Sequence, residues 1–213
     1  MKTKYASKNS LKRLPFYLDY LKKKQSAGDI YISSTSIARG LGLNDVQVRK
    51  DLAMVSQTGG KPKVGYEIKE LISDIKLFLG MKNDNQSVLV GAGSLGSALL
   101  GYHGFDEYGL SIVGAFDTDA HKIDSEINGF RICSMDKLTP FCQENDIRIG
   151  IITVPREGAQ DVCDLLIRAG VKAIWNFAPT KLSVPDDILV QNENMASSLA
   201  ILSRHLNLNM NKR

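Results

Sequence analysis

The stretch SVLVGAGSLGSALLGY, residues 87–102, constrains the fold more than any other part of the chain. An apolar run typical of a buried strand is followed by three glycines spaced G-x-G-x-x-G and then by a helix-compatible segment. The first glycine permits a sharp turn, the second lets the backbone approach a pyrophosphate, and the third allows a helix to pack closely on a strand. The amides and dipole of that helix attract phosphate. We therefore expect this turn to bind a dinucleotide through Gly91, Ala92, Gly93, Ser94, Leu95 and Gly96.

An acidic residue follows the next apolar segment. Residues 111–116 form a second strand pattern that ends in Asp117, close to the ~20-residue spacing at which an acid meets the adenosine ribose in this fold. A carboxylate there accepts hydrogen bonds from ribose hydroxyls and repels a 2′-phosphate, which favours NAD over NADP. The alternative is that Asp117 only ends a strand before a turn that contains Asp119.

Charge divides the chain into two parts. Residues 1–84 contain 16 Lys and Arg against 8 Asp and Glu, whereas the remainder contains 11 against 15. A basic part joined to an acidic part suggests that the first meets a polyanion. A helical domain that is merely solvated by its lysines is the alternative. At 213 residues, the chain is long enough for two compact domains.

The sequence lacks several patterns that bear on the localisation of the protein and on the redox state of its cysteines. The sequence shows no long apolar run for a membrane span and no secretory signal pattern, so we expect a cytoplasmic protein that does not associate with a membrane. The three cysteines, Cys133, Cys142 and Cys163, have no C-x-x-C spacing, and we interpret them as reduced packing residues. No metal-ligand cluster is recognisable.

The basic part predicts a helix-turn-helix. Ser34 or Thr35 can cap a short helix, Gly40 and Gly42 break it, and Asn44 can cap a second helix from Asp45. On the second helix Val48, Leu52 and Val55 share one face and should point into a core. The other side carries residues able to contact base edges, thymine methyls and phosphates in a major groove: Val46, Gln47, Arg49, Lys50, Ala53 and Met54.

A basic hairpin is predicted directly after this helix. Turn residues in QTGGKPKVGYEI separate two short extended pieces and place Lys61 and Lys63 at the tip, so we expect a winged helix. A loop with incidental lysines is the alternative. A further helix over residues 66–79 then connects to the second domain.

These motifs occur in this order in one known family. With VQVRKDL, VGYEI, VGAGSLGSAL, FDTD, TVPRE and WNFAP, the chain resembles the Rex family of redox-sensing transcriptional repressors over nearly its whole length. The resemblance implies a homodimer that binds a palindromic operator in double-stranded DNA through its N-terminal domains. It also implies that NADH and NAD+ are sensed ligands, and that DNA is released when NADH binds.

Two other functions are compatible with a dinucleotide-binding motif. A small NAD-dependent oxidoreductase with a basic accessory domain needs a proton-handling group. Tyr20 and Lys24 have a Y-x-x-x-K spacing but precede the cofactor motif, and nothing assembles around His103, His121 or His205, so we expect no catalytic residue and no enzyme. A nucleotide-binding or coenzyme A-binding adaptor of the same fold would bind its ligand without recognising an operator.

The C-terminal half predicts the rest of a parallel sheet. Residues 147–153 and 171–179 resemble strands with their following turns, and residues 155–170 resemble an amphipathic helix. Ligands of open α/β sheets lie beyond the carboxyl ends of the strands. The expected walls of the nicotinamide site are Thr153, Val154, Pro155, Asn176, Phe177, Ala178 and Pro179, with core and turn packing as the alternative for Phe177 and Pro179.

The last segment predicts a helix with an apolar stripe of Leu199, Leu202 and Leu206. Such a helix can dock on its own domain, whereas the resemblance implies exchange between subunits near the partner's nucleotide site. In the family an acid followed by Phe begins this helix, in a network with a tyrosine and an arginine. Context assigns Tyr102 and Arg13 to those partners, and the acid's position holds Asn194, followed by Met195. We expect NADH to be distinguished from NAD+ more by the packing of Phe177, Met195 and Tyr102 than by charge.

The predicted fold class is therefore α/β. We expect a winged-helix DNA-binding domain with a linker helix over residues 1–84, a Rossmann-like NAD(H)-binding domain with a parallel sheet over residues 85–192, and an exchanged C-terminal dimerisation helix over residues 193–213.

Overall fold

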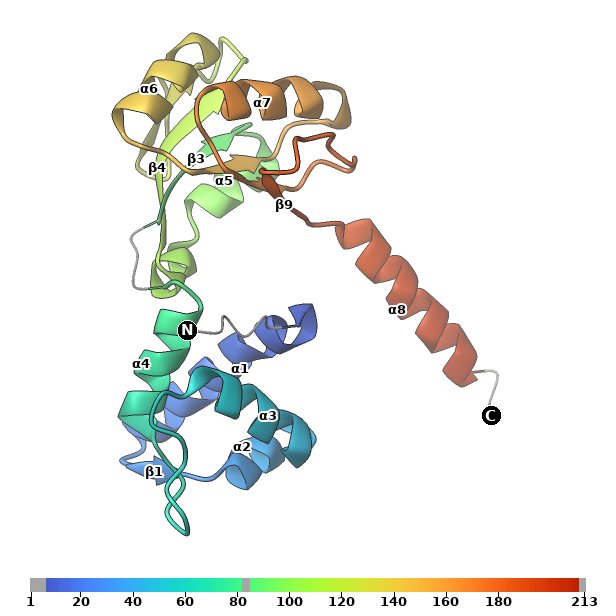
Figure 1. The fold of residues 1–213 in the computed structure, drawn as a ribbon. Coiled ribbons are helices and arrows are strands. Elements are labelled where there is room, and N and C mark those ends of the chain that lie inside the picture. The colour runs from blue at the N-terminus through green and yellow to red at the C-terminus, as the bar shows by residue number, and fades with distance from the viewer. Residues whose placement is uncertain (1–6, 82–84, 211–213) are drawn as a thin grey trace. The chain divides into compact units, whose positions relative to one another are not determined.

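The computed structural model of the chain describes residues 7–81 and 85–210. The chain separates into two compact units, Met1–Asn83 and Asp84–Arg213 (Figure 1).

The first unit is a small helical domain with one short sheet. Its elements are α1 (Lys8–Ser26), β1 (Tyr31–Ile32), α2 (Ser34–Leu41), α3 (Asp45–Val55), β2 (Tyr66–Glu67) and α4 (Ile68–Phe78). β1 and β2 pair antiparallel, with Ile32 opposite Tyr66. The four helices surround one apolar core that includes Leu14, Leu18, Ile37, Leu52 and Leu71. Val48, Leu52 and Val55 are buried in it, as the helical spacing predicts.

Local details of this unit differ from the sequence prediction. Ser33, rather than Ser34 or Thr35, caps α2, because its side chain accepts from the Ser36 amide. Gly40 does not break the helix; it lies within α2, where a Cβ would collide with the ring of Tyr20. Gly42, in the left-handed conformation, ends the helix. The linker helix begins at Ile68, because the two residues before it pair with β1.

The second unit contains a seven-stranded sheet in the order β5-β6-β4-β3-β7-β8-β9. The strands are β3 (Asn85–Val90), β4 (Leu110–Asp117), β5 (Glu126–Ile127), β6 (Phe130–Ser134), β7 (Ile149–Ile152), β8 (Ala173–Asn176) and β9 (Leu189–Asn192). All the pairings are parallel except that of β5 with β6. The strand order reverses between β3 and β7, which is where open α/β sheets bind their ligands.

Helices cover both faces of this sheet (Figure 1). α6 (Leu138–Glu144) and α7 (Arg156–Arg168) pack on the face that carries Val88 and Val90. α5 (Ser94–Leu100) packs on the opposite face, which carries Leu89. This alternation along β3 is expected for a strand buried on both sides. The unit also contains two short 3-10 helices, η1 (His103–Tyr108) and η2 (Met135–Lys137). The sequence pattern predicted no bounds for β5, β6, β9 or α6.

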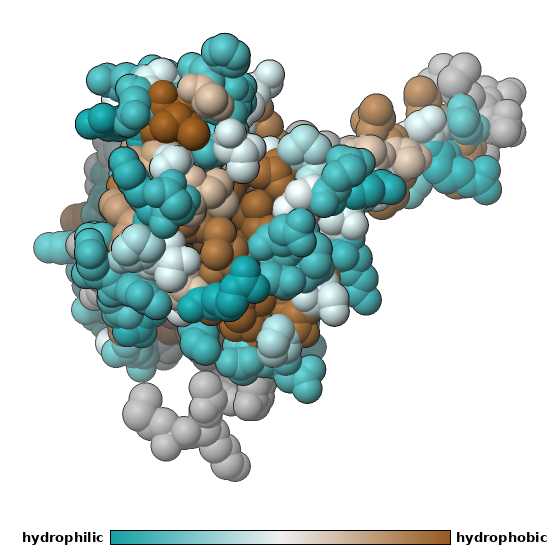
Figure 2. Space-filling view, turned by 90° about the horizontal axis from the view of Figure 1, so that it is seen from above, coloured by the Kyte–Doolittle hydropathy of each residue, from teal (hydrophilic) through white to brown (hydrophobic). Residues whose placement is uncertain are grey.

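The C-terminal helix α8 (Met195–Met210) exposes its apolar stripe within the single chain. Its large apolar side chains are 41–65% exposed: Leu199, Ile201, Leu202, Leu206 and Leu208. Figure 2 shows these brown side chains along α8 among polar ones. Docking of the stripe on its own domain, one of the two sequence-based alternatives, is therefore wrong for this chain alone.

Two of the three cysteines pack in the interior, as the sequence pattern predicts. Cys133 lies in β6, and Cys142 and Cys163 are buried in α6 and α7, all with free thiols. Burial raises the pKa of each of the Cys142 and Cys163 thiols to about 11. Within residues 7–81 and 85–210, no helix is both long and apolar enough to cross a membrane.

Candidate nucleotide and nucleic-acid sites

The glycine turn follows β3 at the reversal of strand order. Gly91 has φ +104°, and a Cβ there would come within 2.9 Å of the Thr153 carbonyl carbon. A Cβ at Gly96 would collide with the Gly91 carbonyl oxygen, so this glycine lets α5 approach the strand. A Cβ at Gly93 would meet no atom within 4 Å. The first and third glycines therefore serve packing, while the second borders open space where a pyrophosphate can approach.

Thr153 holds this turn in place. Its hydroxyl donates to the Gly91 carbonyl oxygen at 2.7 Å, and its amide donates to the Val90 carbonyl oxygen at 2.9 Å. The residue thereby joins the end of β7 to the glycine turn. Its neighbours Val154 and Pro155 are partly buried and exposed respectively, at the start of α7.

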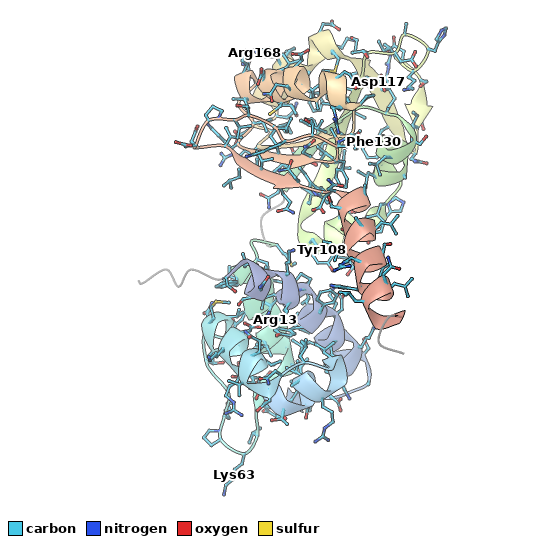
Figure 3. All side chains as sticks on the ribbon, turned by 90° about the vertical axis from the view of Figure 1, so that its right-hand side faces the viewer. Arg13, Lys63, Tyr108, Asp117, Phe130 and Arg168 are labelled. Atoms are coloured by element: carbon cyan, nitrogen blue, oxygen red, sulfur yellow. The ribbon has the colours of Figure 1, made fainter. Side chains whose placement is uncertain are left out.

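Asp117 lies at the end of β4 (Figure 3) and is hydrogen-bonded to the glycine turn. Its Oδ2 accepts from the Ala92 amide at 2.8 Å and from Lys122 Nζ at 3.0 Å, and its Oδ1 accepts from the Asp119 amide at 2.9 Å. Burial opposes ionisation, but the hydrogen bonds from Asp119, Lys122 and Ala92 outweigh it and hold the pKa of Asp117 below its ordinary value. The acid is thus ionised and buried, with 8% of its surface exposed.

Sequence reasoning missed Lys122. The hydrogen bond to Asp117 raises the pKa of this lysine, so the two side chains form an ion pair beside the turn. Its signal in the sequence was only a lysine five residues after the acid.

The segment after β8 is organised by a buried amide. Asn176 is fully buried, and its Nδ2 donates to Asn192 Oδ1 at 2.8 Å and to the Thr180 carbonyl oxygen at 2.9 Å. Its Oδ1 accepts from the Ala178 amide at 3.0 Å. The expectation that Asn176 faces a ligand is therefore wrong, because its polar atoms are used to shape the turn. Ala178 is also buried, whereas Phe177 is half-buried and Pro179 is exposed.

A row of aromatic rings connects two of the expected site residues. The ring centroids of Tyr102 and Phe105 are 4.8 Å apart, those of Phe105 and Trp175 are 5.4 Å apart, and those of Trp175 and Phe177 are 4.7 Å apart. Trp175 Nε1 donates to Glu193 Oε1 at 3.2 Å. Phe105 and Trp175 were not anticipated, since nothing in their spacing indicated contact.

Asn194 lies at the beginning of α8. Its Oδ1 accepts from the Ser197 amide at 2.9 Å, which is the geometry of a helix N-cap. A cavity of about 270 Å³ is lined by this residue together with residues 178–181, 192 and 193. The side chain of Met195, the other expected sensor residue, lies outside the described part of the structure.

The expected recognition helix α3 is capped by Asn44, whose Oδ1 accepts from the Val46 and Gln47 amides. Arg49 and Lys50 are exposed, and Gln47 is half-buried. Arg49 also pairs with Asp45 at 2.7 Å, an exposed contact one helical turn away.

The expected wing is a tight turn. The amide of Lys61 donates to the Gly65 carbonyl oxygen at 2.8 Å, and the Gly65 amide donates back at 2.9 Å. Instead of two extended pieces, one bridge closes this turn, and the chain then enters β2. Lys63, with φ 63°, projects at the tip (Figure 3). A groove of about 340 Å³ is lined by Ser33, Ser34, Arg49, Gly60, Lys61, Lys63, Val64, Gly65 and Tyr66.

Arg13 is held by an acid that sequence reasoning missed. Its Nε lies 2.7 Å from Asp51 Oδ2, and its Nη2 donates to Oδ1 at 3.0 Å. Tyr17 also donates to Oδ2 at 2.7 Å, while burial is the larger cause that raises the pKa of this phenol to about 12. Asp51 lies on the buried face of α3, three residues after Val48. An acidic residue within this apolar stripe was the feature of the sequence that could have indicated a buried ion pair.

Two family models match the chain. A model described as "CoA binding domain" matches residues 82–180, and one described as "Putative DNA-binding protein N-terminus" matches residues 6–53. The second match lies within the first unit, and the first match covers residues 84–180 of the second unit together with the two residues before it.

Full-length relatives extend these matches. The chain is 44% identical over 206 residues to the redox-sensing transcriptional repressor Rex of Treponema denticola, covering 97% of this chain and 98% of that protein. It is 45% identical over 194 residues to the repressor Rex of Carboxydothermus hydrogenoformans, covering 91% and 93%.

Solved structures agree with these relatives. RSP in complex with β-NAD+ and operator DNA matches with a TM-score of 0.91 and 32% identity, over 97% of this chain and 94% of that one. RSP in complex with β-NADH matches with a TM-score of 0.83 and 33% identity, over 96% of both chains.

Proposed function

This chain belongs to the Rex family of redox-sensing transcriptional repressors, and from that premise we propose that it binds a palindromic operator in double-stranded DNA as a homodimer and leaves it when NADH binds. The observation that carries the proposal is the likeness, over nearly the whole chain, to a solved structure that holds β-NAD+ and operator DNA together. A two-fold symmetric dimer matches the symmetry of a palindromic site.

The nucleotide unit has features that suit NAD(H). Open space beside Gly93 admits a pyrophosphate, and the ionised Asp117 offers acceptor oxygens at the end of β4. Tyr102 and Phe177, linked by their row of rings, offer apolar surface toward the nicotinamide half. NADH and NAD+ differ by one positive charge, and because Asn194 carries no charge we propose that this protein distinguishes them more by packing around the nicotinamide than by that charge.

The N-terminal unit supplies the contacts to DNA. We assign base contacts to Gln47 and Lys50 on α3, and phosphate contacts to Arg49 and to Lys61 and Lys63 of the wing. Arg49 and Lys50 are exposed on α3, and Lys61 and Lys63 are exposed on the turn. Gln47 is half-buried on α3, beside Asp51. Because Arg13 is engaged by Asp51, its part in DNA binding is to support α3.

The alternatives have less support. The named relatives are transcriptional repressors, so an oxidoreductase is not favoured. Tyr20 packs against Gly40 and against the apolar core of the helical unit, which accounts for it as a packing residue. The family model described as "CoA binding domain" leaves a nucleotide-binding adaptor as the second candidate, and selection of an operator sequence distinguishes a repressor from such an adaptor.

We place the protein in the cytoplasm, where its DNA partner lies.

The proposal is tested with an operator selected from a randomised duplex pool. NADH and NAD+ are then titrated separately in a mobility-shift measurement with the full chain. NADH should lower the bound fraction at concentrations where NAD+ does not. Binding of nucleotide without any sequence selection would favour the adaptor instead, and steady NADH oxidation with a carbonyl substrate would favour the enzyme.

A further inference from the structure

Asp51 is a buried charge on the helix that is expected to recognise DNA. Only 2% of its surface is exposed, although it belongs to α3, whose other faces carry Arg49 and Lys50. Two hydrogen bonds from Arg13 and one from Tyr17 hold the carboxylate in one orientation. Such a network fixes the position of α3 relative to α1.

The same carboxylate reaches one residue of the expected DNA face. Gln47 lies one helical turn before Asp51, and its Nε2 donates to Asp51 Oδ1 at 3.4 Å. An ionised carboxylate only accepts hydrogen bonds, so the amide nitrogen of Gln47 must face it. The Oε1 of Gln47 is thereby turned away from Asp51.

Ionisation of Asp51 is secured by its surroundings. Burial opposes the charge, but hydrogen bonds from Arg13, Tyr17 and Ser10 together outweigh it and lower the pKa of Asp51. The side chain of Arg13 is 20% exposed, so its positive charge is itself partly shielded from water. The orientation of Gln47 therefore persists at neutral pH.

An outward carbonyl oxygen restricts what Gln47 can bind. In the major groove, adenine and cytosine present donors through their exocyclic amino groups, whereas guanine presents two acceptors and thymine an acceptor and a methyl group. Residues in the first turns of a recognition helix contact base edges. The oriented amide thus matches an adenine or cytosine on the strand it faces.

We propose that Asp51 is a positioning residue that orients Gln47 so that its carbonyl oxygen accepts a hydrogen bond from the exocyclic amino group of one operator base. This inference rests on the proposed DNA binding and specifies what one residue of the recognition helix reads. The contribution of Asp51 acts through Gln47, and Asp51 itself touches no base.

The experiment first locates the base pair. Operators are selected from a randomised pool by the full-length protein and by Gln47→Ala, and the position whose preference disappears is identified. At that pair the adenine is replaced by purine, or the cytosine by 2-pyrimidinone, to delete the amino group. Affinities of both proteins for both duplexes form a double-mutant cycle, which cancels the weaker pairing of the altered base.

The unmodified protein should lose about 5-fold to about 100-fold in affinity when the amino group is deleted, which is the range of one base contact. The affinity of Gln47→Ala should fall only by the amount that the weakened base pair itself accounts for. In Asp51→Asn the new amide can donate to Gln47, so the penalty should shrink while the salt dependence of binding remains. Asp45→Asn is the matched control, because Asp45 also lies on α3 but accepts its side-chain hydrogen bonds from Arg49, Ser34 and Thr35.

Several results overturn the inference. If deletion of the amino group lowers the affinity of the unmodified protein and of Gln47→Ala equally, Gln47 does not bind that group. The same conclusion follows if Gln47→Ala keeps the base preferences of the unmodified protein. An unchanged penalty in Asp51→Asn shows that Asp51 does not orient the amide. Failure of the unmodified protein to select any sequence instead rejects the proposed function.

A second measurement applies if Asp51→Asn does not fold. The side-chain amide of Gln47 is observed by NMR in the unmodified full-length chain and assigned by its absence in Gln47→Ala. Bonding to the carboxylate shifts one amide proton downfield of the other glutamines. A Gln47 amide at the average glutamine position overturns the role of Asp51.

Discussion

Lys122 Nζ lies 3.0 Å from Asp117 Oδ2, so the acid that ends β4 carries its own counter-ion. An isolated carboxylate at this position repels a 2′-phosphate, whereas a paired one repels it less. Selectivity for NADH over NADPH is therefore expected to reflect the balance of the two side chains and not the acid alone.

The first prediction concerns this pair. Asp117→Ala should weaken NADH binding, because ribose hydroxyls lose an acceptor, and should reduce the preference over NADPH, because the negative charge is gone. Lys122→Gln should strengthen that preference, since the charge of Asp117 is then uncompensated. Calorimetric titration of the full-length protein with each nucleotide measures both. Asp117→Asn is the control that removes charge but keeps an acceptor, and equal affinities of the unmodified protein for NADH and NADPH would contradict the role of Asp117.

The helix-turn-helix and the dinucleotide fold could be predicted because both depend on local patterns. Glycine spacing, caps such as Asn44 and apolar periodicity act over a few residues, and α3, β3, β4 and α7 follow from them. β6, β9 and α6 are short elements. The two strands form by pairing with neighbouring strands, and α6 forms by burying its apolar side chains against the sheet. Their local sequence therefore carried too little signal.

Two site residues could not be predicted for the same reason, because their contacts are not local in the sequence. Asp51 and Lys122 find their partners through the fold, across 38 residues in the first case and through a loop conformation in the second. Sequence separation hides such contacts, whereas the strand-to-helix turn containing Gly91 and Gly96 is local. Conversely, Asn176 occupies a strand end, as ligand-binding residues do, and only its complete burial showed that its amide is structural.

A second prediction concerns DNA binding. Lys50→Ala on α3 and Lys63→Ala on the wing should each weaken operator binding. The loss of one phosphate contact lowers the slope of log affinity against log salt by about 1, whereas a lost base contact costs about 1–3 kcal/mol and relaxes specificity at one position. Lys69→Ala, on the exposed surface of α4, is the matched control. Unchanged affinity and selectivity in Lys50→Ala would show that this residue does not contact the operator.

A third prediction concerns the ion pair in the helical unit. Arg13→Met leaves Asp51 buried without its cation, which should lower the free energy of unfolding by about 3 kcal/mol. The pKa of Asp51 is depressed in the folded protein, so its contribution to stability is present above the unfolded pKa of about 3.9 and is lost as pH falls below it. Denaturant unfolding at pH 7 and pH 3 should therefore show a smaller difference between the two proteins at pH 3. A constant difference would mean that the ion pair does not contribute.

The fourth prediction concerns the exposed stripe of α8. If this stripe is buried against a second copy, Leu202→Glu should place a charge in the interface and shift the protein toward monomers. Sedimentation measures the oligomeric state, and Ser203→Glu adds the same charge beside the stripe as a control. An unmodified protein that sediments as a monomer would contradict the dimer, and a dimeric Leu202→Glu variant would place the interface elsewhere.

The last prediction addresses the discrimination of NADH from NAD+. Asn194 caps α8 through its Oδ1, and Asp is an equally good cap, so Asn194→Asp should keep the helix while adding one negative charge. NAD+ carries one positive charge more than NADH on its nicotinamide ring, and the added carboxylate should therefore shift the affinity ratio toward NAD+. Asn194→Ser retains a capping oxygen without charge and should leave the ratio unchanged. Titration of both nucleotides against the three proteins measures the ratios, and the same ratio in Asn194→Asp as in the unmodified protein would remove this position from the sensor.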